Sequence, residues 1–366
     1  MTFQNIRTSE LLEQLGNISF PETQRGDQVL RDLVGSNEVA IGLFTEISRR
    51  LQMLEKANHP FKGAREIVFA HGEFMHWSNA TVPAMSHSLH YGSSVFEGLR
   101  GYKQDNGDTA IFRLGDHVDR LIRSANFTGI KLPFDGDPQR IAEIICQTVK
   151  LNKMSDCYIR PCAYRGPIPG VKGVEQAVDD FIVAVWEWGH YNGDKAQLIP
   201  NLRRIHPDTT DVESKVGGHY VNSLRAFFCI NVKDVTEAIM LDCDGNLAEG
   251  SSSNIFLLFD DGNFYTPPVG HILPGKTRDA VIQFIGDLGG KVIEGNLAPE
   301  KLSEAKGVFL TGSATEVQPL TSIVNGTGQI LFECEKVPDA ITRISDLFQE
   351  VVRGRVPKYS HWLTVI

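Results

Sequence analysis

The sequence predicts a two-domain α+β protein with an N-terminal appendage. Its 366 residues are more than a single hydrophobic core usually organises. Strand and helix patterns mix in the first half, turn signals are richer in the second, and Gly, Asn and Asp gather between them. These shifts predict an N-terminal extension at 1–62, a small domain at 63–186, an interdomain loop at 187–195 and a large domain at 196–366.

The composition is that of an ordinary globular enzyme. Apolar residues make up 42% and charged residues 22% of the chain, without low-complexity tracts or repeats. The net charge of -9 disfavours nucleic acid or an anionic membrane as the main partner, because such partners usually require a basic excess. No apolar run reaches the length of a membrane-spanning helix. We therefore expect small-molecule ligands.

Cysteines and histidines indicate neither disulfides nor a metal centre. The 6 cysteines are scattered without a CxxC pair, which is typical of reduced thiols in a cytosolic protein. His87 and His90 have no further obvious ligands nearby, so we expect no metal. The N-terminal stretch contains Glu10 and Glu13 and lacks an apolar core, which argues against a signal peptide. The cytoplasm is the expected location.

Hydrophobic periodicity predicts the elements of the first half. In the extension, apolar residues from Val39 to Leu54 repeat at helical spacing. In the small domain, a helix predicted at 116–126 has an apolar stripe that leaves Arg120 outside it. The remaining predictions here are strands at 67–69, 109–112, 157–159 and 181–186 and a helix at 138–150.

Turn signals organise the second half. Asp244-Gly245 and Asp261-Gly262 are strong hairpin turns. They predict a three-stranded meander with Glu249 on its middle strand, just before a run of small residues. The predicted strands are 237–241, 247–259, 263–266, 291–294 and 307–311, and the predicted helices are 277–288 and 338–352.

A lysine within residues 211–220 is the first candidate for chemistry. Lys215 is followed by Gly217-Gly218, which carry no side chain and let a flat ligand or a second backbone approach the amine. Tyr220 then opens a segment with the apolar spacing of an amphipathic helix. A lysine on such a turn beside a phenol can hold a carbonyl cofactor as a Schiff base. The alternative is an ordinary lysine on a solvated loop.

Residues 270–277 satisfy the P-loop expression G-x-x-x-x-G-K-[ST] and open a helix. Two details oppose a nucleotide-binding P-loop: Pro267-Pro268 disfavours a central strand before it, and no aspartate follows the strand at 308–310 to hold magnesium. Lys276-Thr277 still stands at a helix N-terminus, where free N–H groups and the helix dipole favour a phosphate. The turn at 311–315 can add donors. A Schiff-base lysine together with this phosphate cup suggests pyridoxal phosphate.

Five sequence blocks together point to one family. They are Ser86–Arg100, Tyr158–Pro161, Lys215–Tyr220, Glu249–Phe256 and Leu273–Arg278. In this order they resemble the branched-chain amino-acid aminotransferases of the fold-type-IV pyridoxal phosphate class, from about residue 64 to the C-terminus. The resemblance implies a small α/β domain, a larger domain with a pseudo-barrel sheet, and a homodimer or higher homo-oligomer. The helical N-terminal extension is not covered by it.

The resemblance also implies the roles of individual residues. Lys215 would carry the pyridoxal 5′-phosphate cofactor and move the substrate proton, and Glu249 would pair with the pyridine nitrogen. A carboxylate there keeps the nitrogen protonated, so that the ring can accept electrons. The other residues implied for the cofactor are Arg120, Lys276, Thr277 and Ser313 at its phosphate and Tyr220 at its phenolic oxygen. Those implied for the substrate are Tyr91, Phe96, Tyr158, Arg160, Trp188, Tyr191 and Ala314, with Tyr91 coming from a partner subunit and Arg160 receiving the distal carboxylate of glutamate.

The implied activity moves the amino group of leucine, isoleucine or valine to 2-oxoglutarate, which gives branched 2-oxo acids and L-glutamate. Three features depart from the family's pattern. His219 stands where asparagine is usual, Lys276 where a small aliphatic residue is common, and residues 166–173 differ from the usual loop beside the substrate. The alternatives are a D-amino-acid or (R)-amine transaminase, a 4-amino-4-deoxychorismate lyase, a P-loop nucleotide-binding protein and a catalytically inactive binding module.

Overall fold

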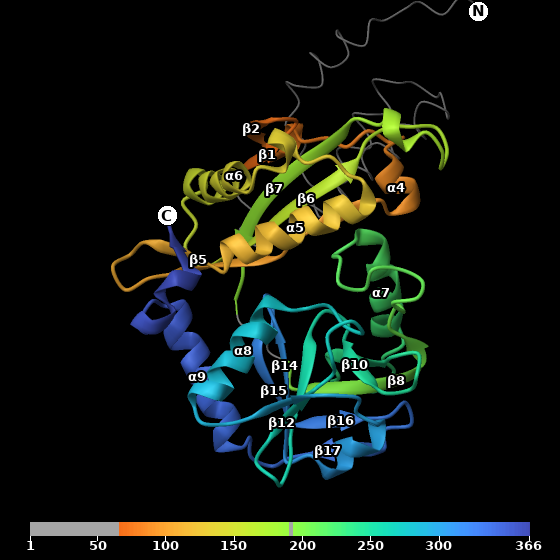
Figure 1. Cartoon of the computed structure of the whole chain (residues 1–366), viewed down its shortest axis with the longest axis vertical. Coiled ribbons are helices and arrows are strands. Elements are labelled where there is room, and N and C mark those ends of the chain that lie inside the picture. Colours follow the sequence, from red (N-terminus) through yellow and green to blue (C-terminus); the bar gives the residue numbers. More distant parts are fainter. Residues whose placement is uncertain (1–65, 190–192) are drawn as a thin grey trace, which may run out of the picture. The chain divides into compact units, whose positions relative to one another are not determined.

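Two β-sheets organise the protein (Figure 1). The computed structural model describes residues 66–189 and 193–366, which belong to one compact unit, Gly63–Ile366. The helix predicted between Val39 and Leu54 lies outside the described residues. None of the helices in the described ranges has the length and apolarity that crossing a membrane requires.

The first sheet has eight strands, and all of its pairings are antiparallel. The strands are β1 (Ile67–Ala70), β2 (Glu73–His76), β3 (Ser94–Phe96), β4 (Leu99–Lys103), β5 (Thr109–Phe112), β6 (Cys157–Arg165), β7 (Asp179–Glu187) and β18 (Leu363–Val365). Their order is β18-β5-β4-β6-β7-β1-β2, and β3 pairs with β6. The strands predicted at 67–69, 109–112, 157–159 and 181–186 are confirmed as β1, β5, β6 and β7, and the last two are longer than predicted.

Two amphipathic helices, α5 (Leu114–Thr128) and α6 (Pro138–Leu151), pack on this sheet (Figure 1). α6 begins at Pro138 because the Asp137 side chain accepts hydrogen bonds from two backbone N–H groups of the first turn. Apolar side chains of both helices join the strands in one core, which includes Leu121, Ile145 and Ile159. Both predicted helices are therefore confirmed, each within a few residues.

The expectation that Arg120 lies outside the buried stripe of α5 was wrong. Arg120 is buried, with 6% of its surface exposed. A guanidinium tolerates burial only when its charge is balanced, and Glu97, which follows β3, provides the balancing carboxylate. Apolar periodicity alone does not detect such a pair.

The second sheet has ten strands and mixes parallel with antiparallel pairs. The strands are β8 (Lys195–Arg203), β9 (Glu237–Leu241), β10 (Leu247–Gly250), β11 (Asn254–Leu258), β12 (Phe264–Thr266), β13 (Val292–Glu294), β14 (Gly307–Gly312), β15 (Glu316–Leu320), β16 (Ser322–Val324) and β17 (Ile330–Glu333). Their order is β13-β12-β11-β10-β9-β8-β16-β17, and β14 pairs with both β11 and β15. β8 runs parallel to β9 and β16, and β12 runs parallel to β13.

Two helices, α8 (Lys276–Asp287) and α9 (Asp339–Val352), pack on β14 and β15 and confirm the helices predicted at 277–288 and 338–352. Their core is rich in aromatic rings. Phe256 and Phe309 stack with ring centroids 4.9 Å apart. Tyr102 and Phe112 of the first sheet contact Phe348 of α9 in the same core. Helices packed on one antiparallel sheet and on one sheet of mixed pairing confirm the predicted α+β class.

The prediction for the middle strand of the meander was wrong in its extent. The stretch predicted as one strand at 247–259 forms two, β10 and β11, which pair antiparallel with Glu249 opposite Asn254. The chain reverses through Ser251–Ser253, where small side chains permit a tight turn. Glu249 and Asn254 therefore face each other across this turn.

The helix opened by Tyr220 is confirmed as α7 (Tyr220–Phe228), but its apolar face is not buried in this chain. The buried side chains of α7 are Ser223 and Ala226, whereas Leu224 is 54% and Phe228 79% exposed. Periodicity identified the helix correctly, and the apolar face of α7 is directed outward.

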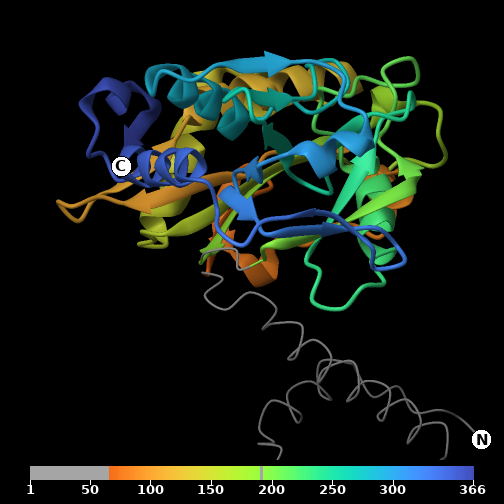
Figure 2. The same ribbon diagram turned by 90° about the horizontal axis from the view of Figure 1, so that it is seen from below.

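The chain ends by returning to the first sheet. β18 pairs with β5, and Figures 1 and 2 both place the C-terminus beside that strand. Arg355, just after α9, pairs with Asp105 in the β4–β5 connection. The remaining short elements are α4 (His87–Tyr91) and the 3-10 turns Trp77–Asn79, Pro133–Gly136, Val174–Gln176, Gly217–His219, Pro299–Glu304 and Pro357–Trp362.

Candidate active site

A cavity of about 410 Å³ collects most of the predicted site residues from both sheets. Its lining combines two lysines, three arginines, a carboxylate, five aromatic rings and a run of small hydroxyl-bearing residues. The predicted residues in the lining are Phe96, Arg120, Tyr158, Arg160, Trp188, Lys215, Tyr220, Glu249, Lys276, Thr277, Ser313 and Ala314. The structure thus brings together side chains that lie up to 218 positions apart, from Phe96 to Ala314.

The backbone around Lys215 is held from two sides. Its carbonyl accepts a hydrogen bond from the Phe96 backbone N–H at 3.1 Å, and Val216 forms an isolated bridge with Val95 of β3. Its own N–H donates to the Ser124 hydroxyl of α5 at 2.9 Å. These bonds fix the backbone and leave the side chain to extend into the cavity.

The two glycines after Lys215 allow a second backbone to come close, which was one of two possibilities that the sequence left open. A Cβ on Gly217 would lie 2.2 Å from the Ser94 hydroxyl oxygen. A Cβ on Gly218 would lie 3.2 Å from the carbonyl oxygen of Gly92, which accepts the Gly218 N–H at 3.0 Å. Any larger residue at these positions pushes the lysine segment away from β3.

The Lys215 amine lies between two aromatic rings. Its Nζ is 4.9 Å from the ring centroids of both Phe96 and Tyr220, and it donates a hydrogen bond to the Tyr220 hydroxyl. The two rings are themselves 4.9 Å apart. Such a site favours one position of the amine and limits its access to water.

A buried ionic cluster adjoins the cavity at Arg120. The Glu97 carboxylate accepts hydrogen bonds from Arg120 Nε at 2.6 Å and Nη2 at 2.9 Å and from His117 Nδ1 at 2.7 Å. Burial alone would raise the pKa of Glu97, but the Arg120 and His117 side chains more than offset it and hold that pKa far below its usual range. The pKa of His117 is lowered, mainly by burial, which favours a neutral imidazole.

Arg120 retains donors for a ligand. Its Nη1 donates to the carbonyl of Pro274 at 2.8 Å, in the loop before α8. A guanidinium carries five N–H groups, and among the described residues only three are used. The unused donors and the cavity wall that Arg120 shares with Lys276 favour an anion there.

The N-terminus of α8 lies beside Arg120. Burial and the nearby Arg120 guanidinium lower the pKa of the Lys276 amine, as expected for cations that share one wall. Thr277 adds a hydroxyl, and the first N–H groups of α8 have no partners within the helix. In the same cavity lining, the buried Thr311 hydroxyl has no hydrogen-bond partner among the described residues. This set of cations, hydroxyls and amides suits a phosphate group.

The strand that precedes α8 argues against the P-loop alternative. β12 pairs antiparallel with β11 and parallel only with the short β13. A nucleotide-binding P-loop follows a central strand of a parallel sheet, and β12 does not have that setting.

Glu249 lies in a network that the sequence did not predict. Its carboxylate accepts hydrogen bonds from Arg204 Nε, from Asn254 Nδ2 at 3.1 Å and from the Leu273 backbone N–H at 3.2 Å. Arg204 directly follows β8 and is 8% exposed, so it balances the carboxylate charge inside the protein. No motif surrounds Arg204, and only its proximity in the fold assigns it to the site.

His219 also lies in the cavity lining, between Lys215 and Tyr220 in sequence. Its Nε2 is 2.9 Å from the Thr210 hydroxyl, which ties the start of α7 to the loop before Lys215. Burial and the Arg204 guanidinium lower the pKa of His219, so the imidazole is favoured in its neutral form.

Aromatic rings surround Arg160 on the remaining wall. The guanidinium carbon is 4.6 Å from the ring centroid of Phe96, 5.4 Å from that of Tyr158 and 5.8 Å from that of Trp186. Trp186 was not predicted as a site residue, because it lies in a strand whose pattern indicates burial on both faces. Trp188 donates its indole N–H to the Ala314 carbonyl at 3.2 Å and so joins two walls of the cavity.

Gly98 gives the Tyr158 hydroxyl its place in the cavity. A Cβ on Gly98 would lie 1.9 Å from the Tyr158 hydroxyl oxygen, which is too close for any side chain. The glycine of the Phe96-Glu97-Gly98 sequence therefore determines the position of the tyrosine opposite.

Two predicted substrate residues are not in the described lining. Tyr91 is on α4, is 50% exposed and contacts the rings of His87 and His90 rather than the cavity of its own chain. Tyr191 lies outside the described residues.

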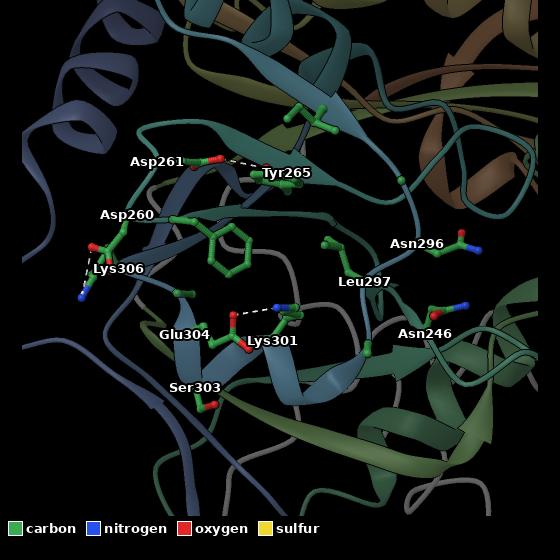
Figure 3. Close-up of a pocket in the computed structure, with 15 residues that line it drawn as sticks. Asn246, Asp260, Asp261, Tyr265, Asn296, Leu297, Lys301, Ser303, Glu304 and Lys306 are labelled. Carbon is green, nitrogen blue, oxygen red and sulfur yellow. Dashed lines mark hydrogen bonds and ion pairs between the residues drawn. The ribbon is translucent and has the colours of Figure 1, made fainter.

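A second cavity, of about 860 Å³, lies elsewhere in the larger sheet (Figure 3). Its charged side chains are largely paired with one another at an exposed rim: Lys301 with Glu304 at 2.7 Å and Lys306 with Asp260 at 3.2 Å. Figure 3 also shows Tyr265 bonded to Asp261. It offers no buried amine, carboxylate and guanidinium together, so the smaller cavity is the better candidate for chemistry.

The fold and the cavity define a class of enzyme. An amine, a charge-balanced carboxylate and a phosphate-sized cup converge, as transamination on a phosphorylated aldehyde requires. Residues 94–323 match the family described as amino-transferase class IV, and the chain belongs to that family.

Relatives within the family share one description. The chain is 32% identical over 307 residues to the branched-chain-amino-acid aminotransferase of Pseudomonas aeruginosa, which covers 82% of this chain and 97% of the relative. A structure of the branched-chain aminotransferase of Thermoproteus uzoniensis with norvaline has a TM-score of 0.75 at 33% identity and covers 83% and 99% of the two chains. The branched-chain amino acid aminotransferase of Thermobaculum terrenum, solved in its PLP-bound holo-form, has a TM-score of 0.74 at 26% identity and covers 83% and 99%.

Proposed function

We propose that this protein is a branched-chain-amino-acid transaminase that moves the amino group of leucine, isoleucine or valine to 2-oxoglutarate. The observation that carries the proposal is the convergence of Lys215, Glu249 and the α8 N-terminus on one cavity. The names of the relatives support the substrate class. The Arg160 pocket supports it further, because aromatic walls accept an apolar side chain while one arginine accepts a carboxylate.

The cofactor of this activity is pyridoxal 5′-phosphate, and the residues present fit it. Arg120, Lys276, Thr277 and Ser313 would hold its phosphate, which the unused Arg120 donors and the unpartnered Thr311 hydroxyl support. Glu249 retains acceptor capacity for a ring N–H, since a carboxylate has about four lone-pair sites. When bound, the cofactor ring accepts the electrons released as the substrate Cα–H bond breaks.

The chain's own groups handle the proton. Lys215 Nζ would take the proton from the substrate Cα and pass it to the bound cofactor rather than back to Cα, and Lys215 is the described amine that lies between the Phe96 and Tyr220 rings. The Tyr220 hydroxyl orients that amine. Arg204 forms an ion pair with Glu249, and the remaining lone pairs of the Glu249 carboxylate would accept the ring N–H of the cofactor.

Replacing Arg160 by methionine is expected to weaken the binding of 2-oxoglutarate and to leave that of L-leucine almost unchanged. The KM for 2-oxoglutarate rises about tenfold or more, because a charged hydrogen bond to its distal carboxylate is lost. The KM for L-leucine changes little, since methionine keeps the pocket apolar. Initial rates with each substrate varied in turn measure the effect. Arg355→Met, on the surface beside Asp105, is the control and leaves both constants unchanged. Equal effects on both substrates would contradict the assignment of Arg160.

The proposed activity is tested by assaying purified protein with pyridoxal 5′-phosphate and 2-oxoglutarate. L-Leucine is expected to yield glutamate and 4-methyl-2-oxopentanoate, and D-alanine is expected to react far more slowly. Faster turnover of D-alanine would favour a D-amino-acid transaminase. Thermal stabilisation by ATP, without a visible absorption band from bound cofactor, would favour the nucleotide-binding alternative.

A homodimer is part of the proposal. Exposed apolar side chains gather on α4 and α7, including Leu89 at 69% and Phe228 at 79%. The backbone contact between Gly92 and Gly218 brings the ends of these elements together. A second copy would cover this face and carry Tyr91 toward the neighbouring cavity. Sedimentation equilibrium should give at least twice the chain mass, and a monomer at micromolar concentration would contradict the dimer.

The proposal also includes the domain limits of the chain and its location in the cell. The division into 1–62, 63–186, 187–195 and 196–366 is supported by the two sheets, although β18 crosses back to the first sheet. Limited proteolysis should cut first between these segments. A cytoplasmic location is supported by the 6 cysteines, all free, and cell fractionation tests it.

A further inference from the structure

Glu237 is a buried carboxylate that the proposed reaction does not use. It is the first residue of β9, is 3% exposed, and forms no ion pair with any described residue. Its Oε1 accepts the backbone N–H groups of Ala238 at 2.8 Å and Ser251 at 3.0 Å, and its Oε2 lies 3.3 Å from the Ser253 hydroxyl. Burial raises the pKa of Glu237, and these hydrogen bonds oppose that rise. A carboxylate in such a position is costly to bury and requires an explanation.

The contacts place Glu237 at the end of a strand ladder. β9 and β10 pair at Leu241 with Leu247 and at Ile239 with Gly250, so β10 has one more residue than β9 between these pairs. This bulge includes Glu249 and re-aims its side chain. Beyond Gly250 the chain turns away from β9 to form β11, and the ladder stops.

Glu237 replaces the missing ladder partner. The ladder ends before it can offer the Ser251 N–H a strand carbonyl. This N–H donates to the Glu237 carboxylate instead. Gly250 leaves room for that carboxylate, because a Cβ there would lie 3.3 Å from Glu237 Cδ and 2.3 Å from the Ser253 hydroxyl oxygen. The Glu237 carboxylate thus holds the turn at residues 251–253 against the start of β9.

This turn connects both ends of the proposed cofactor site. Glu249 precedes the turn and Asn254 follows it, and their side chains hydrogen-bond at 3.1 Å. The front of the turn meets β14, where a Cβ on Gly312 would lie 3.3 Å from the Ser252 carbonyl oxygen. Ser313, proposed at the phosphate, is the next residue. A shift of the turn therefore displaces the Glu249 carboxylate at the ring end of the proposed cofactor site and the Ser313 hydroxyl at its phosphate end.

We propose that Glu237 is a positioning residue that sets the cofactor site by holding the 251–253 turn against β9. Glu237 is not among the residues that line the cavity, and it acts through Glu249 and the Gly312-Ser313 backbone. The inference rests on the proposed function, because it requires pyridoxal 5′-phosphate to occupy this cavity.

The test measures cofactor binding in the full-length protein. Wild type, Glu237→Ala, Glu237→Gln and Glu237→Asp are stripped of cofactor and titrated with pyridoxal 5′-phosphate, with tryptophan fluorescence and visible absorption as readouts. Glu237→Ala should raise the dissociation constant about tenfold or more, because two N–H groups lose their acceptor. Glu237→Gln should stay within about threefold of wild type, since its amide oxygen accepts both N–H groups and its NH₂ donates to Ser253.

A matched control separates positioning from general loss of stability. Thr266→Val removes a buried hydrogen bond to the Ile255 carbonyl in the same sheet. It should lower the melting temperature while leaving cofactor affinity unchanged. Should Glu237→Ala fail to fold, Glu237→Asp carries the test, because its carboxylate is one carbon too short to reach the turn and should weaken binding.

The outcomes are distinct. Unchanged affinity in folded Glu237→Ala or Glu237→Asp overturns the inference, and so does a loss of affinity in Thr266→Val as large as theirs. Failure of Glu237→Gln to restore binding also overturns it. Absence of binding by the wild-type protein itself contradicts the proposed function.

Discussion

Replacing Lys215 by alanine is expected to lower the rate of transamination by at least about 10³-fold, because the variant loses the group that moves the substrate proton. The fold should survive. The backbone N–H and carbonyl of residue 215 keep their bonds to Ser124 and Phe96, and among the described residues the polar and ring contacts of the lost side chain are those with Tyr220 and the Phe96 ring. Steady-state rates together with thermal unfolding measure both effects.

Lys276→Ala is the control for this prediction, because it removes the other amine of the same cavity. This variant should bind pyridoxal 5′-phosphate more weakly, since the phosphate cup loses a cation, yet keep turnover when the cofactor is in excess. Retained turnover in Lys215→Ala would show that Lys215 is not the catalytic amine. A larger loss of turnover in Lys276→Ala than in Lys215→Ala would show the same.

Replacing Glu97 by glutamine is expected to cause the largest loss of stability. Glu97 lies fully buried between Arg120 and His117, and the neutral amide leaves the guanidinium charge without its counterion. Breaking a buried pair in this way costs about 3 kcal/mol or more in the free energy of unfolding. Cofactor affinity should also fall, because Arg120 loses its orientation. Denaturant unfolding and cofactor titration measure the two effects, and Asp105→Asn, in an exposed pair with Arg355, is the control that should change neither.

The Glu97 effect should depend on pH with a definite sign. Pairing holds the folded pKa of Glu97 far below the ordinary value of 4.5, so the unfolded chain binds a proton at a pH where the folded chain does not. The stabilisation is therefore complete above about pH 5 and declines as the pH falls below 4.5 toward the folded pKa. The difference in unfolding free energy between wild type and Glu97→Gln should shrink between pH 7 and pH 3. A difference that grows at acid pH would contradict the proposed charge balance.

Local patterns were sufficient for most elements of the fold. Asp137 and Pro138 mark the start of α6, and short apolar runs mark β1 and β5. The signals at Lys215 and at the α8 N-terminus were also local, since each depends on glycines and a helix start within a few residues. Such patterns report interactions between residues that are close in sequence.

The features that were missed depend on distant parts of the chain. Arg120 is buried because Glu97 neutralises it, and Arg204 enters the site because it balances Glu249 across 45 positions. Trp186 lies in a continuous apolar run that indicates a strand buried on both faces, and it nevertheless lines the cavity. The exposed apolar face of α7 has the same periodicity as a buried one. Periodicity reports that a face is apolar, and only the fold shows what that face contacts.

Covalent trapping of the cofactor tests directly whether Lys215 is the amine that binds it. Protein loaded with pyridoxal 5′-phosphate is reduced with borohydride, digested and analysed by mass spectrometry for the lysine that carries the pyridoxyl group. We expect loss of the visible absorption band and modification of the peptide that contains Lys215. Modification at Lys276, or no modified lysine within the cavity, would contradict it.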